Sequence, residues 1–201
     1  MTLLSIARAI AINTGTQIPT EVLSSSDPSA LKIVEFTQEA GEEIARRVDW
    51  GELRLTTTLT GTGTNDDFNL PSDFARLVPG NAVTIAGAPI RVGMSADEWN
   101  SLTPISGTPR YARLTGASIS FYPYPTLGAE IKIAYQSKEW CGNGTAWGSD
   151  SDFGTVPELL IQQGALWRWR RQLGQDYQDY LAEFESSLAE YAKFDDGMRL
   201  P

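Results

Sequence analysis

Carboxylates are the side chains of this sequence with the widest chemical reach, because two of them on either side of a sugar linkage can hydrolyse it. The chain has 25 Asp and Glu residues, of which Asp66 and Asp67 are adjacent. A catalytic pair needs one raised and one lowered pKa, and neighbours in a stretch rich in Gly, Thr and Asn are usually both solvated. Their spacing gives no support for catalysis, and a carboxylate-dependent glycan or cell-wall hydrolase stays an alternative.

Histidine and cysteine set the firmest limits on function. The 201 residues include no His, which excludes Ser–His–Asp and Cys–His nucleophiles, a His general base and His-ligated zinc or haem. Cys141 is the single cysteine, so an internal disulfide and a cysteine metal cage are excluded too. Only Lys138 lies near enough to favour the thiolate, so we expect Cys141 to be inert. We predict a protein that is not an enzyme and has no cofactor or metal site.

Two loops resemble ligand-binding motifs without completing them. Asp150, Asp152 and Gly154 match the front half of a calcium loop, but Ile161 stands where that loop needs a carboxylate. The Gly- and Thr-rich stretch near 60–66 lacks the spacing and the lysine of a phosphate-binding loop. We therefore interpret the first as turn chemistry and the second as the tip of a flexible hairpin.

Three arginines alternate with two tryptophans near the C-terminus, at Trp167, Arg168, Trp169, Arg170 and Arg171. Binding of nucleic acid through phosphates needs a clustered cationic surface, whereas the formal charge of this chain is −9. We favour a helix whose arginines meet acidic neighbours on the same or an adjoining subunit. Nucleic-acid binding by this cluster is the alternative.

Trp140 and Trp147 have two possible roles. Exposed on a β surface, they could stack on a sugar ring or enter a partner's pocket; buried, they would complete a core. We favour packing within the core or between subunits. A carbohydrate-binding β module remains an alternative.

The spacing of apolar residues predicts that the chain begins with two helices. Residues 3–10 repeat at helical spacing up to a stop near Gly15. Asp27 before Pro28 is typical of an N-cap and the first position of a second, longer helix. The apolar face of that helix comprises Ile33, Phe36, Ala40, Ile44 and Val48.

The middle of the chain loses helical spacing and gains β-branched residues, glycines and prolines. Gly116 marks a tight hairpin, with the turn at 115–117, and residues 139–156 are rich in Gly, Ser and Asp and indicate a loop. The predicted strands are 53–59, 82–85, 90–92, 111–114, 118–122 and 131–135.

Helical spacing returns after Pro157. We expect helices at 157–173 and 176–195, separated at Gly174 and packed as an antiparallel pair. The apolar stripe of the first helix comprises Leu159, Leu166, Trp169 and Leu173.

These elements predict an α+β fold. The two chain ends, 1–50 and 157–201, would form a helical bundle of about four helices, with a small antiparallel β-rich region inserted at 51–156. No window approaches the roughly 18 apolar residues of a membrane span, because Arg8 interrupts the apolar N-terminus. We therefore expect a cytoplasmic product with no membrane contact.

The order of several short motifs resembles the head-to-tail adaptor (connector, or head-completion) proteins of tailed bacteriophages. The first block is Asp-Pro-Ser-Ala at 27–30, which opens the long helix, followed by Val-Asp-Trp at 48–50 and Phe-Asn-Leu-Pro-Ser-Asp-Phe at 68–74. The middle block is the strand at 111–114 with Ser-Ile-Ser-Phe-Tyr-Pro-Tyr-Pro at 118–125.

The later blocks of the chain continue this resemblance. They are Ile-Lys-Ile-Ala-Tyr at 131–135, Pro-Glu-Leu-Leu at 157–160 and the helix that follows Gly-Gln-Asp at 174–176. The resemblance covers nearly the whole chain, and its specificity lies in the order and spacing of the motifs. Residues 139–156 depart from the pattern, as does the short C-terminal tail.

The resemblance implies a structural virion protein of the neck, made in the host cytoplasm. Twelve copies would form a ring (a homododecamer) beneath the portal protein, join the DNA-filled head to the tail or stopper protein, and continue the DNA channel. A channel wall of negative charge would repel phosphates, so double-stranded DNA would pass without specific binding. By the same resemblance, we expect the tip near 60–66 to face the tail.

Ring closure needs a heterologous interface between identical subunits, and we expect helices 157–173 and 176–195 to supply much of it. The alternative is that their aromatic rings all lie in the intramolecular core. The candidate interface residues here are Trp167, Arg168, Trp169, Arg170, Arg171, Tyr177, Tyr180 and Phe184.

The C-terminus carries apolar residues where solvated ones are usual, at Phe194, Met198, Arg199 and Leu200 with its neighbours. We predict that this end docks on a neighbour, with the portal as the favoured partner, and fraying is the alternative. Deleting 195–201 would then weaken portal binding without changing the circular-dichroism spectrum.

Overall fold

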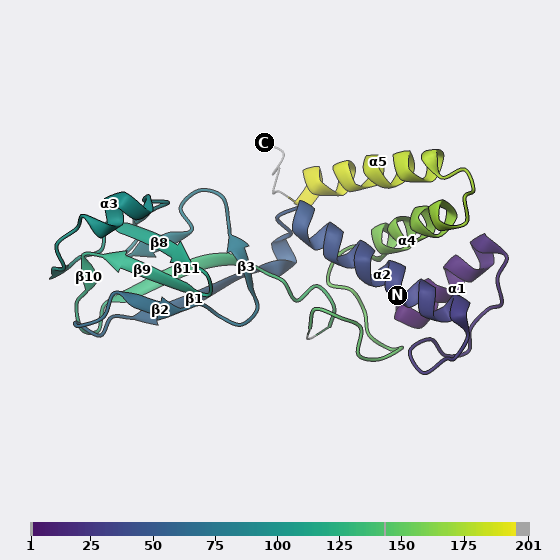
Figure 1. The fold of residues 1–201 in the computed structure, drawn as a ribbon, viewed down its shortest axis with the longest axis horizontal. Helices are drawn as coiled ribbons and strands as arrows, with labels where there is room; N and C mark the ends of the chain where they lie inside the picture. Colours follow the sequence, from purple (N-terminus) through teal and green to yellow (C-terminus); the bar gives the residue numbers. More distant parts are fainter. Residues whose placement is uncertain (1, 143, 196–201) are drawn as a thin grey trace. The chain divides into compact units, whose positions relative to one another are not determined.

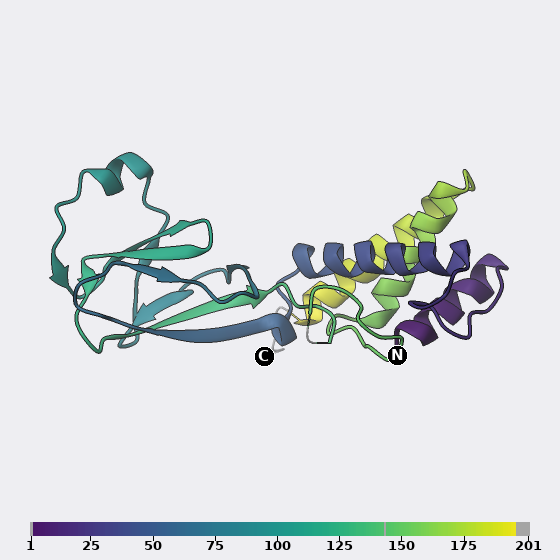
Figure 2. The same ribbon diagram turned by 60° about the horizontal axis from the view of Figure 1, so that its bottom comes forward.

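A computed structural model describes residues 2–142 and 144–195 of the chain. The chain forms two units (Figure 1): a helical unit, Met1–Leu53 with Lys138–Pro201, and a β unit, Arg54–Ser137. Figure 2 gives a second view of both. The domain boundaries expected from the sequence differ from these units chiefly at 138–156. This segment belongs to the helical unit and not to the β unit.

The first two helices form where capping residues and apolar spacing predict them. Helix α1 spans Leu3–Thr14, capped by the Thr2 hydroxyl, and ends at Gly15, whose φ of 69° suits a residue without a Cβ. Helix α2 spans Pro28–Arg47, and the Asp27 carboxylate accepts the Ser29 N–H at 3.0 Å. Both N-caps satisfy backbone donors that the helices leave unpaired.

The last two helices pack against the first two. Helix α4 spans Glu158–Gln172 and helix α5 spans Gln178–Asp195. Helix α4 contacts α1, α2 and α5, so the helical unit is organised around it. The structure thus contains the four predicted helices in order, arranged about α4 and not clearly as a regular bundle.

Two close contacts of α2, with α4 and with Trp140, depend on glycine. A Cβ on Gly164 would lie 2.8 Å from the Ala40 Cβ, and one on Gly41 would overlap the Trp140 ring. The helical core then fills with large side chains on every side, including Ile6, Ile33, Trp50, Leu160 and Phe184.

The β unit holds two main sheets. Strand β1 (Arg54–Thr60) begins the five-stranded sheet, in the order β1, β11 (Glu130–Ser137), β4 (Val83–Ile85) and β5 (Ala88–Pro89), and β3 (Phe74–Leu77) also pairs with β11. The second sheet runs β2 (Asp67–Asn69), β9 (Ser118–Tyr122), β8 (Tyr111–Thr115) and β6 (Arg91–Val92). The predicted hairpin at Gly116 joins β8 and β9, in antiparallel register with Thr115 opposite Ser118.

Smaller elements complete the β unit. Strands β7 (Ser106–Gly107) and β10 (Tyr124–Pro125) pair in parallel, and helix α3 spans Ala96–Asn100 with a capping box from Ser95. A 3₁₀ turn, Gly51–Leu53, precedes β1 in the chain. The core of the unit comprises chiefly Val83, Ala112, Ile119, Phe121, Ile131 and Ile133.

The fold class is therefore α+β, as predicted, but the expectation of a small β region is wrong. The described residues form eleven strands in three sheets and five α-helices. The missed elements are β2, β3, β5, β7, β10 and α3. Each is five residues or shorter, so its own sequence carries too little periodicity to reveal pairing with a distant strand.

Candidate assembly surface of the helical unit

Arg168 lies at the centre of the packing between α2 and α4. Its side chain is 9% exposed. Its Nε donates to Glu39 at 3.1 Å, one terminal nitrogen donates to Glu43, and the other donates to the Gly164 carbonyl at 2.8 Å. Its guanidinium also lies 4.4 Å from the Trp167 ring centroid. This arginine meets acidic neighbours of its own chain, as expected, and its donors are engaged there.

A second arginine connects α2 to α5. Arg47 donates to both carboxylate oxygens of Glu185, at 2.7 and 2.6 Å, and to Glu43 at 3.0 Å. The hydrogen bonds from Arg47 lower the pKa of the Glu185 carboxyl, and those to Glu185 raise the pKa of Arg47 further. Glu43 thus joins both arginines, and one row of charges on α2 holds both C-terminal helices.

Arg170 and Arg171, near the end of α4, contact aromatic rings. The guanidinium of Arg170 lies 4.1 Å from the Tyr180 ring centroid, and that of Arg171 lies 5.2 Å from the Trp167 centroid. The rings of Trp167 and Tyr177 are 6.4 Å apart. Cations over ring faces are attracted by the ring quadrupole, so Arg170 binds a ring of α5 and Arg171 binds a ring of its own helix.

The aromatic candidates divide between core and surface. Trp167, Trp169 and Phe184 are buried, and Trp169 packs edge-on against Phe36. Their burial favours the intramolecular alternative for these three rings. The candidates that keep exposed or half-exposed side chains are Arg170, Arg171, Tyr177 and Tyr180.

Two leucines that the helical spacing predicts in a core stripe are exposed. Leu159 and Leu173, at the two ends of α4, are 43% and 54% exposed. Spacing alone misplaced them because it does not show which parts of a helix its neighbours cover. We define the α4–α5 surface as Leu159, Arg171, Leu173, Tyr177 and Tyr180.

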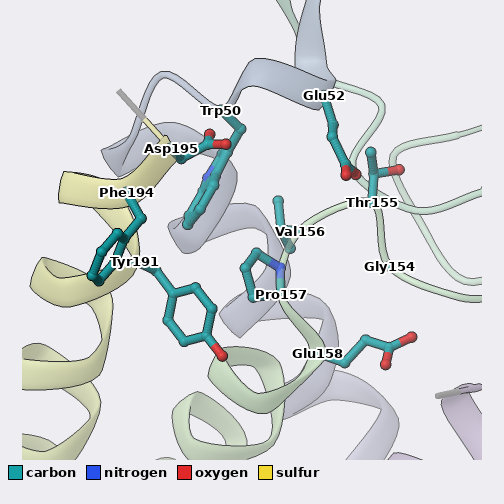
Figure 3. Close-up of a pocket in the computed structure, with 10 residues that line it drawn as sticks. All are labelled: Trp50, Glu52, Gly154, Thr155, Val156, Pro157, Glu158, Tyr191, Phe194 and Asp195. Atoms are coloured by element: carbon teal, nitrogen blue, oxygen red, sulfur yellow. The ribbon is translucent and has the colours of Figure 1, made fainter. Parts of the chain in front are cut away.

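A pocket of about 370 Å³ lies at the C-terminal end of α5 (Figure 3). Tyr191 and Phe194 come from α5, while Val156 and Pro157 come from the segment before α4. Asp195 accepts the Gly51 N–H at 2.6 Å, which fixes the end of the helix against the turn that follows α2. The other lining residues are Trp50, Glu52, Gly154, Thr155 and Glu158.

The lining of this pocket combines carboxylates with aromatic rings. Glu52, Glu158 and Asp195 supply negative charge, and Phe194 is 77% exposed. Such a lining suits a cationic side chain that has an apolar neighbour. Of these lining residues, only Phe194 is a candidate from the sequence, because the pocket joins three segments far apart in the chain. Met198, Arg199 and Leu200 lie outside the described residues.

The two candidate sugar-stacking tryptophans are buried. Trp140 is 1% and Trp147 7% exposed, and their rings pack edge to face with centroids 4.9 Å apart. Trp140 also donates to the Thr145 carbonyl at 3.1 Å. A ring in this position offers no face to a sugar, so the structure contradicts a carbohydrate platform built on these two residues.

The loop that resembles a calcium site uses its carboxylates on its own and neighbouring backbone. Asp150 accepts the N–H groups of Val22 and Leu23 at 2.8 and 2.9 Å, and Asp152 accepts those of Gly148 and Ser149 at 2.7 and 2.8 Å. The Asp152 contacts agree with turn chemistry, whereas Asp150 holds the backbone of the distant segment at Val22 and Leu23. No group of His, Cys, Asp and Glu residues that could hold a metal ion occurs within 2–142 and 144–195.

Cys141 behaves as the sequence predicts. It is 1% exposed, and burial, with a smaller contribution from Asp152, raises the pKa of its thiol to about 12. The thiolate is the nucleophilic form, so burial and the raised pKa both disfavour a reactive Cys141. In the part of the chain that the structure describes, no helix is long and apolar enough to cross a membrane.

A family model for the SU10 adaptor protein matches residues 1–201. The chain therefore belongs to the SU10 adaptor protein family, which agrees with its resemblance to phage head-to-tail adaptors. This family is structural, which supports an adaptor role in the phage particle and suggests that the protein is not an enzyme. A comparison with curated proteins found no significant match.

Proposed function

We propose that this protein is a head-to-tail adaptor that assembles into a ring of twelve beneath the portal, joins head to tail or stopper, and continues the DNA channel in the virion neck. The observation that carries the proposal is the family match over the entire chain. An adaptor needs surfaces that bind its partners and does not need a catalytic site.

The α4–α5 surface is the candidate for contact between neighbouring subunits. Its members are two exposed leucines, the exposed Arg171 and two half-exposed tyrosine rings, and arginine and aromatic residues are enriched at interface centres. In a ring, this surface would meet a different face of the next copy.

The pocket at the end of α5 is the candidate for the portal contact. Phe194 is exposed at its rim, and the proposed docking tail, with Met198, Arg199 and Leu200, follows directly in the sequence. Because Asp195 holds the Gly51 N–H, a truncation that tests the tail should begin at residue 196, one residue later than the sequence suggests.

Charge supports passage of DNA without binding. Each chain has a formal charge of −9, and a ring of twelve would carry twelve times that charge. Net repulsion of phosphates would let a duplex slide through the channel.

Mass measurement of the purified full-length chain, alone and mixed with its cognate portal, tests this function. We expect a complex with twelve adaptor copies per portal ring and no turnover of glycans. Failure to associate with the portal, combined with hydrolysis of cell-wall polymer, would overturn the proposal.

Matched variants separate the two surfaces. L173D should weaken contact between adaptor copies on the portal, whereas L127D, at an 82% exposed leucine of the β unit, should not. F194A and truncation after Asp195 should weaken portal binding at least tenfold, while F153A, at a phenylalanine that is 60% exposed, should leave it unchanged. Equal effects within each pair would reject the assignment of that surface.

A further inference from the structure

Strand β1 lies at the edge of its sheet, and among the described residues it pairs only with β11. The direction of its backbone groups follows from β11. The Ala134 N–H donates to the Ala82 carbonyl at 2.7 Å, and the Ala134 carbonyl accepts the Val78 N–H at 3.3 Å. Ala134 therefore bonds on the side of β11 away from β1.

Alternate residues of an antiparallel strand bond on opposite sides. The neighbours of Ala134 at 133 and 135 thus face β1, where their register partners are Thr57 and Leu55. The same alternation assigns Leu59 to the β11 ladder, and Gly61, two residues on, donates to the Ala129 carbonyl at 2.8 Å. The residues whose N–H and C=O groups face the open edge are Thr56, Thr58 and Thr60.

After Arg54, this edge lacks the usual protection against pairing with another chain. Natural edge strands are short, charged, bulged or interrupted by proline. Strand β1 has seven residues, is in register with β11 along its whole length, and has no charge or proline after Arg54. Leu55 is also 43% exposed. The strand is therefore suited to accept another strand.

The sequence of β1 indicates which strand that is. Residues 55–59 read Leu-Thr-Thr-Thr-Leu in either direction, so the segment is its own complement in an antiparallel pair. We propose that β1 pairs with β1 of a second copy of this chain, about a two-fold axis through Thr57, and joins the two five-stranded sheets edge to edge.

The two-fold pairing uses the groups that the fold leaves open. Thr56 would face Thr58 of the second copy, and each such pair would exchange both backbone hydrogen bonds. Leu55 would face Leu59 of the second copy at a non-hydrogen-bonded position, where side chains approach most closely, so its exposed surface would be covered. Both the backbone alternation and the side-chain pattern fit this one register.

This inference goes beyond the proposed ring. A two-fold contact uses the same patch on both copies and closes at two, whereas a ring needs two different patches. We therefore assign the pairing to the free protein, before it joins the portal. In that form, the second copy covers the uncharged edge of β1. Its success or failure is independent of portal binding.

The experiment measures the mass of the full-length free chain by light scattering over a range of concentrations. We expect two copies at high concentration. In the variant T56K/T58K, the introduced lysines of the two copies would face one another, and both positions are exposed, so the variant should fold and remain a single copy. The control T115K/T126K adds the same charge at exposed threonines outside β1 and should dimerise like the wild type.

Mixing variants of opposite charge should restore the dimer. T56E/T58E should also be a single copy alone, but an equimolar mixture with T56K/T58K should form a mixed pair, because opposite charges then face across the axis. Amide hydrogen exchange gives a second readout. The amides of Thr56, Thr58 and Thr60 should exchange at least tenfold faster in T56K/T58K than in the wild type, while those of Leu55, Thr57 and Leu59 should stay protected in both.

Three results would overturn the pairing. They are a wild-type chain that is a single copy at every concentration, a T56K/T58K variant that still dimerises, and a mixture of the lysine and glutamate variants that does not associate.

Discussion

The tryptophans of the helical core differ in how they use their indole N–H. Trp50 donates to the Ile44 carbonyl at 2.9 Å, near the end of α2. The indole nitrogens of Trp167 and Trp169 are buried and have no hydrogen-bond partner within the described residues. The first side chain therefore contributes a hydrogen bond and ring area, while the other two contribute ring area.

This difference predicts unequal costs for the same substitution. W50F removes a buried hydrogen bond and leaves a carbonyl without it, which should lower the free energy of unfolding by about 1–3 kcal/mol beyond the lost ring area. W169F removes a donor that has no partner, so its cost should be smaller. Urea unfolding of both variants measures the difference, and an equal or larger loss for W169F would contradict this account.

The Arg47–Glu185 ion pair predicts a dependence of stability on pH. Because the hydrogen bonds from Arg47 lower the folded-state pKa of Glu185, the pair stabilises the protein above the unfolded-state pKa of about 4.3 and loses this contribution as the pH falls through the folded-state value. Both side chains are partly exposed, so the effect should be about 0.5 kcal/mol.

Unfolding at pH 7 and pH 3 tests this prediction. E185Q should lose less stability than the wild type between the two pH values. E190Q, at an exposed glutamate of the same helix, should behave like the wild type. A pH response of E185Q identical to that of the wild type would show that the pair contributes nothing.

At the scale of elements, α2 packs closely against α4 and against Trp140 because glycines stand at these contacts. Gly41 faces the Trp140 ring and Gly164 faces Ala40. Alanine is ordinarily the better helix former, by about 1 kcal/mol. At these two positions, packing opposes helix propensity.

G41A should therefore destabilise the protein, by about 1–3 kcal/mol, since its methyl group would overlap the buried Trp140 ring. S186A, at an exposed position of α5, should be neutral or slightly stabilising. Thermal unfolding measures both variants, and a melting temperature of G41A at or above that of the wild type would contradict the packing argument.

At the scale of the whole molecule, the β unit is inserted into the helical unit at a single point. Arg54 opens β1 and pairs in register with Gln136, near the end of β11. The two ends of the β unit are therefore adjacent strand partners, and the unit has its own core. A segment with this geometry has what it needs to fold alone.

The fragment 54–137 should accordingly fold by itself. We expect a β-type circular-dichroism spectrum and one cooperative unfolding transition. The chain with 54–137 replaced by a short Gly/Ser linker should retain its helical spectrum, because the linker spans only the distance between paired strands. A disordered fragment would show that the helical unit is needed to hold the sheets together.

The sequence by itself determined the local features. Caps such as Asp27 and Gly15, and apolar spacing over many turns, act within a few residues, so the order and bounds of the long helices could be predicted. The longer strands and the hairpin at Gly116 followed for the same reason. The absence of His excluded several catalytic chemistries, and the order of motifs indicated the adaptor family, which the family match then confirmed.

Tertiary structure decided what depends on contacts between distant segments. Residues 138–156 read as part of the β region, but Trp140 and Trp147 fill the helical core. Helical spacing placed Leu173 on a buried stripe, but the neighbours of α4 leave it exposed. Burial, pockets and open strand edges arise when segments far apart in the chain meet, and periodicity within one segment carries no information about that meeting.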